Sequence, residues 1–284
     1  MSGSVTDGAP APNRRTVFFV SDRTGITAEM LGNSLLSQFE AIDFQRRTIP
    51  FVDTPDKIAE VVRTIDATAE KNGQRSLVFS SIVDEAMSAQ LGKANALFLD
   101  LFQVFIAPLE AELAAKSSHA AGRSHGIANI SEYFARIEAI NFAQRHDDGA
   151  ATRDLAKAQV ILVGVSRCGK TPTALYLALQ FGVLAANFPL TPDDFAEHKL
   201  PASIVPYRER LFGLTIDPER LQQIRDARRP SSKYAALDNC RYEVREAEKL
   251  MARERISTID TTSRSIEEIA TTIVHRAGLK RHIF

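Results

Sequence analysis

Apolar and polar residues follow two different periods along residues 16–81. Residues 16–20 and 76–81 form short, mainly apolar runs with the length of buried strands, and residues 44–52 also predict a strand, whereas residues 27–39 and 55–71 carry apolar side chains at helical spacing. Strands and helices therefore follow one another in a βαβαβ order, which is typical of an open parallel sheet. We expect the first half of the chain to form such a sheet.

The pattern becomes helical over residues 84–113. Its apolar side chains between positions 97 and 106 indicate a core or an interface rather than a ligand site. Residues 116–129 are small and polar and include glycine, so they predict a mobile loop. The two histidines of this loop, His119 and His125, have no Cys, Asp or Glu at metal-ligand spacing, and we expect no zinc site there.

The second half of the chain repeats the alternation of strand and helix. Residues 130–142 have a helical pattern, and the polar turn at 146–149 is typical of a domain boundary. Apolar runs at 160–163, 182–186, 211–216 and 256–259 then predict further strands. The expected organisation is α/β throughout: a disordered tail over 1–15, an N-terminal open parallel-sheet domain over 16–150, and a C-terminal P-loop kinase-like domain over 151–284.

Residues 158–180 combine a buried strand, a glycine-containing loop and a helix. Gly164, Gly169, Lys170 and Thr171 fit the pattern G-x-x-x-x-G-K-S/T at every position, in the strand-to-helix context that this motif requires. The glycines let backbone N–H groups turn inward onto a phosphate, and the helix adds the positive end of its dipole. Lys170 is a candidate catalytic residue because it adds a full positive charge, and the Thr171 hydroxyl is a candidate Mg²⁺ ligand. The predicted nucleotide-binding set is Gly164, Val165, Ser166, Arg167, Cys168, Gly169, Lys170 and Thr171.

Two acidic residues that end predicted strands are candidate catalytic groups. Asp217 ends the strand at 211–216 and Asp260 ends the strand at 256–259. In phosphotransferases of this fold, an acid in such a place holds a Mg²⁺-bound water or acts as the base. The alternative for Asp217 is a simple helix cap. The helix that follows it carries four basic residues that form either a phosphate clamp or a solvated face: Arg220, Arg225, Arg228 and Arg229.

Two further polar segments have a structural and a functional interpretation. The loop at 21–29 follows a strand end, where ligands gather in open α/β sheets, but it is equally a capped turn with Thr24 or Thr27 as the N-cap. Asp147 and Asp148 lie in the polar turn, and we expect these adjacent carboxylates to be only solvated.

Composition narrows the choice of partners. The 284 residues include 35 basic and 35 acidic side chains, so nothing global attracts nucleic acid or an anionic membrane. No apolar stretch approaches the ~20 residues that span a bilayer. With two well separated cysteines there is no disulfide framework, and we expect a reducing cytoplasmic location. Cys168 lies in the predicted phosphate-binding loop, residues 164–171, which we call the phosphate loop. At this position we expect the backbone, rather than the side chain, to contribute to binding.

Four segments resemble one family, the bacterial phosphoenolpyruvate synthase regulatory proteins. They are GVSRCGKTPTALYLALQFG (164–182), LFGLTIDPERLQQIR (211–225), VFFVSDRTGITAEMLGNSLLSQF (17–39) and RIEAINFAQRHDDG (136–149). The resemblance implies a bifunctional serine/threonine kinase and phosphorylase. Such an enzyme uses ADP to phosphorylate and inactivate the phosphohistidine form of the synthase on a threonine, and uses inorganic phosphate to remove that group as pyrophosphate. It also places the nucleotide on the loop from Gly164 to Thr171.

Several alternatives stay open at the level of sequence. The related regulators of pyruvate, phosphate dikinase perform the same chemistry on another target, although GKTPT favours the synthase branch. The final strand and helix, with Asp260, are similar to the last βα unit of small P-loop kinases, which leaves a small-molecule kinase as a rival. A non-catalytic nucleotide sensor is a third reading. We expect the N-terminal domain to recognise the partner enzyme, and the oligomeric state, including a homo-oligomer, stays open.

Overall fold

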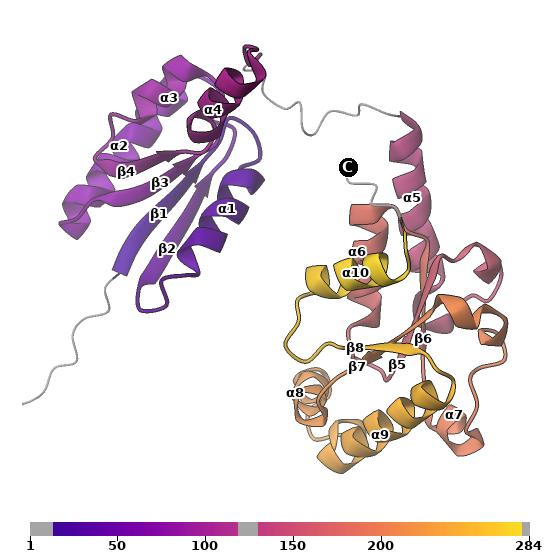
Figure 1. Cartoon of the computed structure of the whole chain (residues 1–284). Helices are drawn as coiled ribbons and strands as arrows, with labels where there is room; N and C mark the ends of the chain where they lie inside the picture. Colours follow the sequence, from indigo (N-terminus) through magenta and orange to yellow (C-terminus); the bar gives the residue numbers. More distant parts are fainter. Residues whose placement is uncertain (1–13, 119–129, 280–284) are drawn as a thin grey trace, which may run out of the picture. The chain divides into compact units, whose positions relative to one another are not determined.

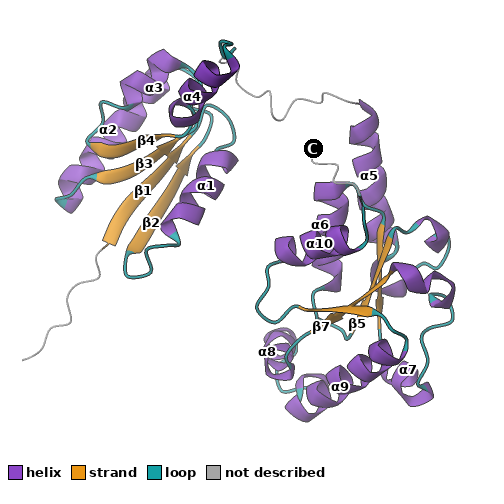
Figure 2. Ribbon diagram, viewed as in Figure 1, coloured by secondary structure: helices purple, strands orange, loops and turns teal. Residues whose placement is uncertain are grey.

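The structure, a computed structural model, describes residues 14–118 and 130–279 (Figure 1). The chain divides into two compact units, Met1–Gly126 and Ile127–Phe284. Each unit contains one sheet of four parallel strands with helices on both faces, which confirms the α/β class and the open parallel sheet of the N-terminal part (Figure 2). The predicted tail is shorter than expected because Arg14 and Arg15 belong to the first strand; residues 1–13, and the predicted loop with His119 and His125, lie outside the described residues.

The first unit is built around a sheet with the strand order β2-β1-β3-β4. Strand β1 is buried along Val17 to Val20, with alternate side chains on opposite faces. Phe18 and Val20 pack against helix α2, and Val17 and Phe19 pack against helix α1. The elements are β1 (Arg14–Val20), α1 (Ile26–Leu36), β2 (Asp43–Ile49), α2 (Pro55–Asn72), β3 (Ser76–Ser80), α3 (Glu85–Leu91), β4 (Ala96–Asp100) and α4 (Gln103–Leu113).

Residues 84–113 are not one helical stretch, so that prediction was wrong. They form α3, the edge strand β4 and α4, and β4 pairs with β3 so that Leu97 lies opposite Leu77 and Leu99 opposite Phe79. A short apolar run fits a strand and a buried helical segment equally well, and its periodicity cannot decide between them. The partner strand β3 decides it here, since β4 completes the edge of the sheet.

The second unit has the strand order β6-β5-β7-β8. Helices α5, α6 and α10 lie on one face of the sheet, and α8 and α9 on the other (Figure 1). Its helices are α5 (Ile130–Arg145), α6 (Lys170–Phe181), α7 (Pro192–Glu197), α8 (Pro218–Arg228), α9 (Leu237–Arg253) and α10 (Ile266–Arg276). Its strands are β5 (Val160–Gly164), β6 (Ala185–Pro189), β7 (Leu211–Thr215) and β8 (Ser257–Asp260), and its short 3-10 helices are η2 (Asp147–Gly149), η3 (Leu155–Lys157), η4 (Val205–Arg210) and η5 (Lys233–Ala235).

The division between the units lies about twenty residues before the polar turn that was expected to mark it. Helix α5 packs on α6 and β6 of the second unit. Phe142 belongs to the large core of that unit, and Ala139 and Ala143 pack closely on Ala178. The turn at 146–149 therefore lies inside the second unit, because the helix before it is held by this apolar contact. Among the described residues, no helix has the length and apolar character needed to cross a membrane.

Candidate phosphate-binding and catalytic site

The loop from Gly164 to Thr171 joins the buried strand β5 to helix α6, as predicted. Strand β5 is wholly buried and pairs with β6 on one side and β7 on the other. Gly164 has no room for a side chain, since a Cβ there would overlap the Leu214 carbonyl oxygen of β7. Gly169 is the N-cap of α6 at a φ of 97°, a conformation that favours glycine. The backbone thus requires glycine at both motif positions. The N–H groups of the first turn of α6, which have no partner within the helix, lie at the end of the loop.

Lys170 is the first residue of α6, and its side chain folds back over the loop. Only 3% of the residue is exposed, and Nζ donates a hydrogen bond of 2.9 Å to the Val165 carbonyl oxygen. An ammonium group has three donors, so two remain for an anion. No carboxylate of the described residues forms an ion pair with it, which leaves its charge directed at the loop.

Thr171 contacts a carboxylate that the sequence reasoning did not assign to the site. Its hydroxyl donates to Asp147 Oδ1 at 2.7 Å, and the Asn187 side-chain amide donates to the same oxygen at 2.6 Å. Asp147 lies 24 residues before Thr171 in the chain. The two Asp residues of the turn were expected to be only solvated, and for Asp147 that was wrong. Two consecutive acidic residues in the sequence do not predict a contact with Thr171. The contact depends on how α5 packs against α6, which brings the turn next to the loop.

A buried histidine next to Asp147 holds the turn in place through both of its ring nitrogens. His146 Nδ1 lies 2.8 Å from the Phe142 carbonyl oxygen and Nε2 lies 2.6 Å from the Arg153 carbonyl oxygen. Asn187 N donates to the His146 carbonyl oxygen at 3.0 Å, and its side-chain oxygen accepts from Asp148 N at 3.0 Å. Asp148 has a φ of 49°, which non-glycine residues rarely adopt and which is common at functional turns. Asp148 is exposed, and Asp147 is half-buried.

Asp217 caps a helix, as the structural alternative predicted. Its carboxylate accepts from Glu219 N and Arg220 N, both at 2.9 Å, and its own N–H donates to the Thr262 hydroxyl at 2.8 Å. Asp260 accepts from Thr262 N at 2.9 Å and from the Thr262 hydroxyl at 2.5 Å. These two hydrogen bonds hold the pKa of Asp260 below its ordinary value.

Asp217 and Asp260 face a hollow of about 390 Å³ at the ends of β7 and β8. Neither forms a hydrogen bond with Lys170 or Thr171 in the part of the chain that the structure describes. The link to the phosphate loop is Thr261, whose hydroxyl lies 3.1 Å from the Cys168 carbonyl oxygen and 3.0 Å from that of Thr215. The structure therefore joins Asp147, and not these two acids, to the motif residues by direct contact.

The three arginines of α8 and Arg229, its C-cap residue, differ from one another. Arg220, Arg228 and Arg229 are exposed. Arg225 is fully buried and forms an ion pair with Glu243, so it belongs neither to a solvated face nor to a clamp that reaches over a ligand.

The backbone of Cys168 forms hydrogen bonds at the loop: its N–H donates to the Val165 carbonyl oxygen at 3.4 Å, and its carbonyl oxygen accepts from the Thr261 hydroxyl at 3.1 Å. The Cys168 side chain is buried, and this burial raises the pKa of the thiol, although the nearby Lys170 charge partly opposes the shift. A neutral thiol in this position is a packing group.

The loop after β1 is a small turn in the first unit. Gly25, at a φ of 82°, is the N-cap of α1, so the expected caps Thr24 and Thr27 are not used. Ser21 Oγ accepts from Arg23 N at 3.1 Å, and Asp22 accepts from Val83 N at 3.3 Å. The hollow beside these residues measures only about 50 Å³, which is far below nucleotide size.

Among the described residues, no group of three or more His, Cys, Asp and Glu side chains is arranged to hold a metal ion. Thr171 and Asp147 nevertheless offer a hydroxyl and a carboxylate oxygen together, which fits Mg²⁺ because that ion takes few protein ligands and keeps several waters.

Comparison with known proteins defines the class. The sequence profile of the kinase/pyrophosphorylase family matches residues 17–274, and the chain belongs to this family. Among its relatives, a protein of Aromatoleum aromaticum is 57% identical over 271 residues, covering 95% of this chain and 98% of the relative. Relatives from Bordetella pertussis and Burkholderia multivorans are 54% and 55% identical, each covering 95% of this chain and 98% and 99% of their own lengths. All three are named as proposed phosphoenolpyruvate synthase regulatory proteins.

Proposed function

We propose that the chain is a bifunctional serine/threonine kinase and phosphorylase that regulates phosphoenolpyruvate synthase. In this proposal it inactivates the synthase by ADP-dependent phosphorylation of a threonine, and reactivates it by phosphate-dependent removal of that group as pyrophosphate. The family assignment and the names of relatives that match over nearly their full length support it. The P-loop kinase-like character of the second unit is part of the same proposal.

The observation that carries the proposal is the grouping of Lys170, Thr171 and Asp147 around one glycine-containing loop. Loop N–H groups and the Lys170 ammonium would hold the β-phosphoryl group of ADP, or orthophosphate in the reverse direction. Thr171 and Asp147 are the residues that would hold Mg²⁺. When bound there, Mg²⁺ neutralises charge on the transferring phosphoryl group.

The two directions share one site and one proton carrier. In the kinase direction, the threonine hydroxyl of the target attacks the β-phosphorus of ADP, AMP leaves, and the hydroxyl proton passes to a carboxylate. In the reverse direction, an oxygen of orthophosphate attacks the phosphothreonine phosphorus, pyrophosphate forms, and the carboxylate returns its proton to the threonine oxygen. The turn with Asp147 and Asp148 now supplies the first candidates for this carboxylate. Asp217 and Asp260 become the second, since both are engaged in hydrogen bonds away from Lys170.

The test is to incubate the protein with purified synthase, ADP and phosphoenolpyruvate, and to follow the mass of the synthase. We expect one added phosphoryl group on a threonine, release of AMP, and removal of the group with pyrophosphate formation when phosphate replaces ADP. Lys170→Ala should abolish both directions. Parallel reactions with pyruvate, phosphate dikinase and with a metabolite panel separate the other targets. Binding of ADP without any turnover would leave a nucleotide sensor instead.

A further inference from the structure

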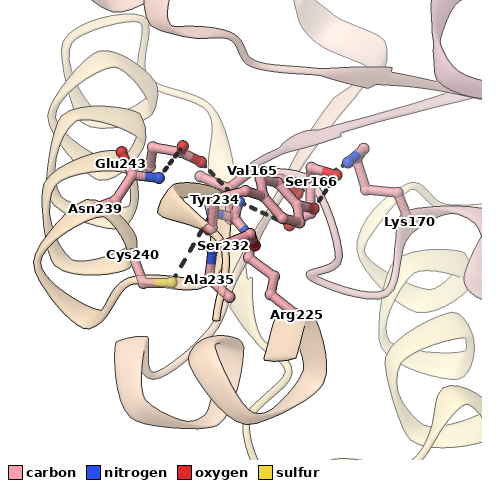
Figure 3. Close-up of polar contacts among 10 residues, drawn as sticks. All are labelled: Val165, Ser166, Lys170, Arg225, Ser232, Tyr234, Ala235, Asn239, Cys240 and Glu243. Atoms are coloured by element: carbon pink, nitrogen blue, oxygen red, sulfur yellow. Dashed lines mark hydrogen bonds and ion pairs between the residues drawn. The ribbon is translucent and has the colours of Figure 1, made fainter. Parts of the chain in front are cut away.

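Arg225 is a fully buried cation that lies against the back of the phosphate loop (Figure 3). Its Nη2 donates to the Ser166 carbonyl oxygen at 3.0 Å and to Glu243 at 2.6 Å. Its Nη1 donates to the Tyr234 carbonyl oxygen at 3.1 Å, and its guanidinium lies over the Tyr234 ring, 4.1 Å from the centroid. One side chain thus connects β5's loop to η5 and α9.

Ser166 is held a second time from the same side. The Tyr234 hydroxyl and the Ser166 hydroxyl form a hydrogen bond of 2.9 Å. The backbone carbonyl and the side chain of Ser166 are therefore both fixed by residues between positions 225 and 243, while its neighbour Lys170 reaches the loop from the opposite side through Val165.

The direction of the Ser166 carbonyl group determines where the next N–H group points. In a trans peptide the C=O and the following N–H are antiparallel, so a Ser166 carbonyl directed at Arg225 turns the Arg167 N–H the other way. Arg167 has a φ of 76°, which a non-glycine residue adopts only when its surroundings hold it there. Inward-facing N–H groups of this kind make the anion-binding concavity of such loops.

We propose that Arg225 is a positioning residue for phosphate binding. Held by Glu243, it fixes the Ser166–Arg167 peptide so that its N–H faces the anion, and it does not touch the anion itself. This inference rests on the proposed phosphate site. A buried arginine without such a role is replaceable, since hydrophobic pairs of similar volume often match or exceed the stability of buried ion pairs.

The experiment compares the wild type, Arg225→Met and the double variant Arg225→Met with Glu243→Leu in the full chain. Thermal unfolding reports stability, and calorimetric titration with inorganic phosphate and with ADP reports binding. We expect the single variant to lose stability because Glu243 is left buried and unpaired. We expect the double variant to regain it while binding phosphate and ADP at least tenfold more weakly than the wild type. Wild-type affinity in the double variant would overturn the inference.

A control uses the half-exposed ion pair of Arg208 with Glu254, whose N···O distance is also 2.6 Å and which, among the described residues, forms no hydrogen bond with the phosphate loop. The variant Arg208→Met with Glu254→Leu should bind phosphate as the wild type does. Tyr234→Phe keeps the ring under Arg225 and removes only the hydroxyl contact with Ser166, so it should weaken phosphate binding without a loss of fold. It supplies the readout if the double variant does not fold, and unchanged affinity then contradicts the inference.

Arg225→Lys separates charge from geometry. A lysine keeps the positive charge but lacks the planar fork that reaches Ser166 and Glu243 together, so its phosphate affinity should fall below that of the wild type. A wild type that binds neither phosphate nor ADP would overturn the proposed function and this inference together. A wild type that binds both, with every variant equal to it, would overturn the inference alone.

Discussion

At the scale of single residues, Asp147 uses one carboxylate oxygen for both of its hydrogen bonds. Thr171 and Asn187 donate to Oδ1, and Oδ2 has no hydrogen-bond partner among the described residues. Asn187 is fully buried, so the carboxylate is oriented by a group that cannot move into solvent. An oriented carboxylate with a free oxygen suits either a water of a Mg²⁺ ion or a proton in transfer.

We expect Asp147→Asn to lower kcat in both directions by roughly 10²- to 10⁴-fold, the range typical of general acid–base groups. The amide keeps the size of the side chain but loses the charge, so thermal unfolding should change little. The measurement is the initial rate of synthase phosphorylation with ADP and of its reversal with phosphate. Asp148→Asn, tested beside it, assigns the proton carrier within the turn.

Asp217→Asn is the discriminating comparison. Asparagine caps helices about as well as aspartate, so α8 keeps its N-cap and the stability should be preserved. Rates close to those of the wild type in both directions would confine Asp217 to capping. A loss as large as that of Asp147→Asn would return the catalytic role to the end of β7.

The two cysteines should be unreactive in the folded protein. Burial raises the pKa of Cys168 and of Cys240, so their thiols stay protonated where an exposed thiol ionises, above about pH 8.5. Each thiol has a higher pKa in the folded protein than in the unfolded chain. The stability that comes from burying the neutral thiols is therefore fully present below about pH 8.5 and is lost as the pH rises through the folded pKa. A disulfide reagent at pH 8 should label neither cysteine before denaturation and both after it; rapid labelling of the native protein would contradict the burial.

At the scale of elements, helix α5 shows what pattern alone cannot assign. The sequence predicted a helix over residues 130–142. That this helix belongs to the second unit depends on contacts of Ala139, Phe142 and Ala143 with residues far along the chain. A polar turn was taken as a boundary because such turns commonly lie between domains. The strands with central places in the sheets were predictable, since they are continuous apolar runs. The edge strand β4 was not predictable, because its apolar run fits a helix equally well and only its pairing with β3 makes it a strand.

The candidate site divides in the same way. Gly164, Gly169, Lys170 and Thr171 were predictable because their spacing within one loop is fixed by local geometry. Asp147 and Arg225 were not, because each reaches the loop only through tertiary packing, over sequence separations of 24 residues to Thr171 and 59 to Ser166.

Helix α5 should be required for a stable second unit. A fragment of residues 127–284 retains it, and a fragment of residues 151–284 lacks it and leaves the face of α6 around Ala178 uncovered. Loss of the Phe142 side chain alone removes burial worth about 1.5–3 kcal/mol. We expect the longer fragment to unfold cooperatively in urea at a clearly higher midpoint than the shorter one. Equal midpoints would show that α5 adds no stability.

At the scale of the whole molecule, the two units have the same strand order. In each sheet the strands lie in the order second, first, third, fourth, and in each the first strand leads through a short loop to a helix capped by a left-handed glycine, Gly25 or Gly169. The charges differ. Helix α6 begins with Lys170, whereas α1 begins with Ile26 and has Glu29 in its first turn. An acidic first turn opposes the binding of an anion at a helix N-terminus.

We therefore expect inorganic phosphate to bind with a stoichiometry of one per chain. Calorimetric titration of the full chain measures this number directly. Lys170→Ala should remove the binding entirely, and Ile26→Ala should leave it unchanged. A second site of similar affinity that survives Lys170→Ala would show that the first unit also holds phosphate.

The packing of α5 has a consequence for how such a regulator can diversify. Because this helix and the turn after it share a core with the strand before the phosphate loop, the distances among the proposed site residues Asp147, Lys170 and Thr171 depend on packing within the second unit. On our expectation that the first unit recognises the target enzyme, that unit can change between homologues while the proposed site in the second unit stays the same. Homologues that modify different clients should accordingly diverge most before residue 127.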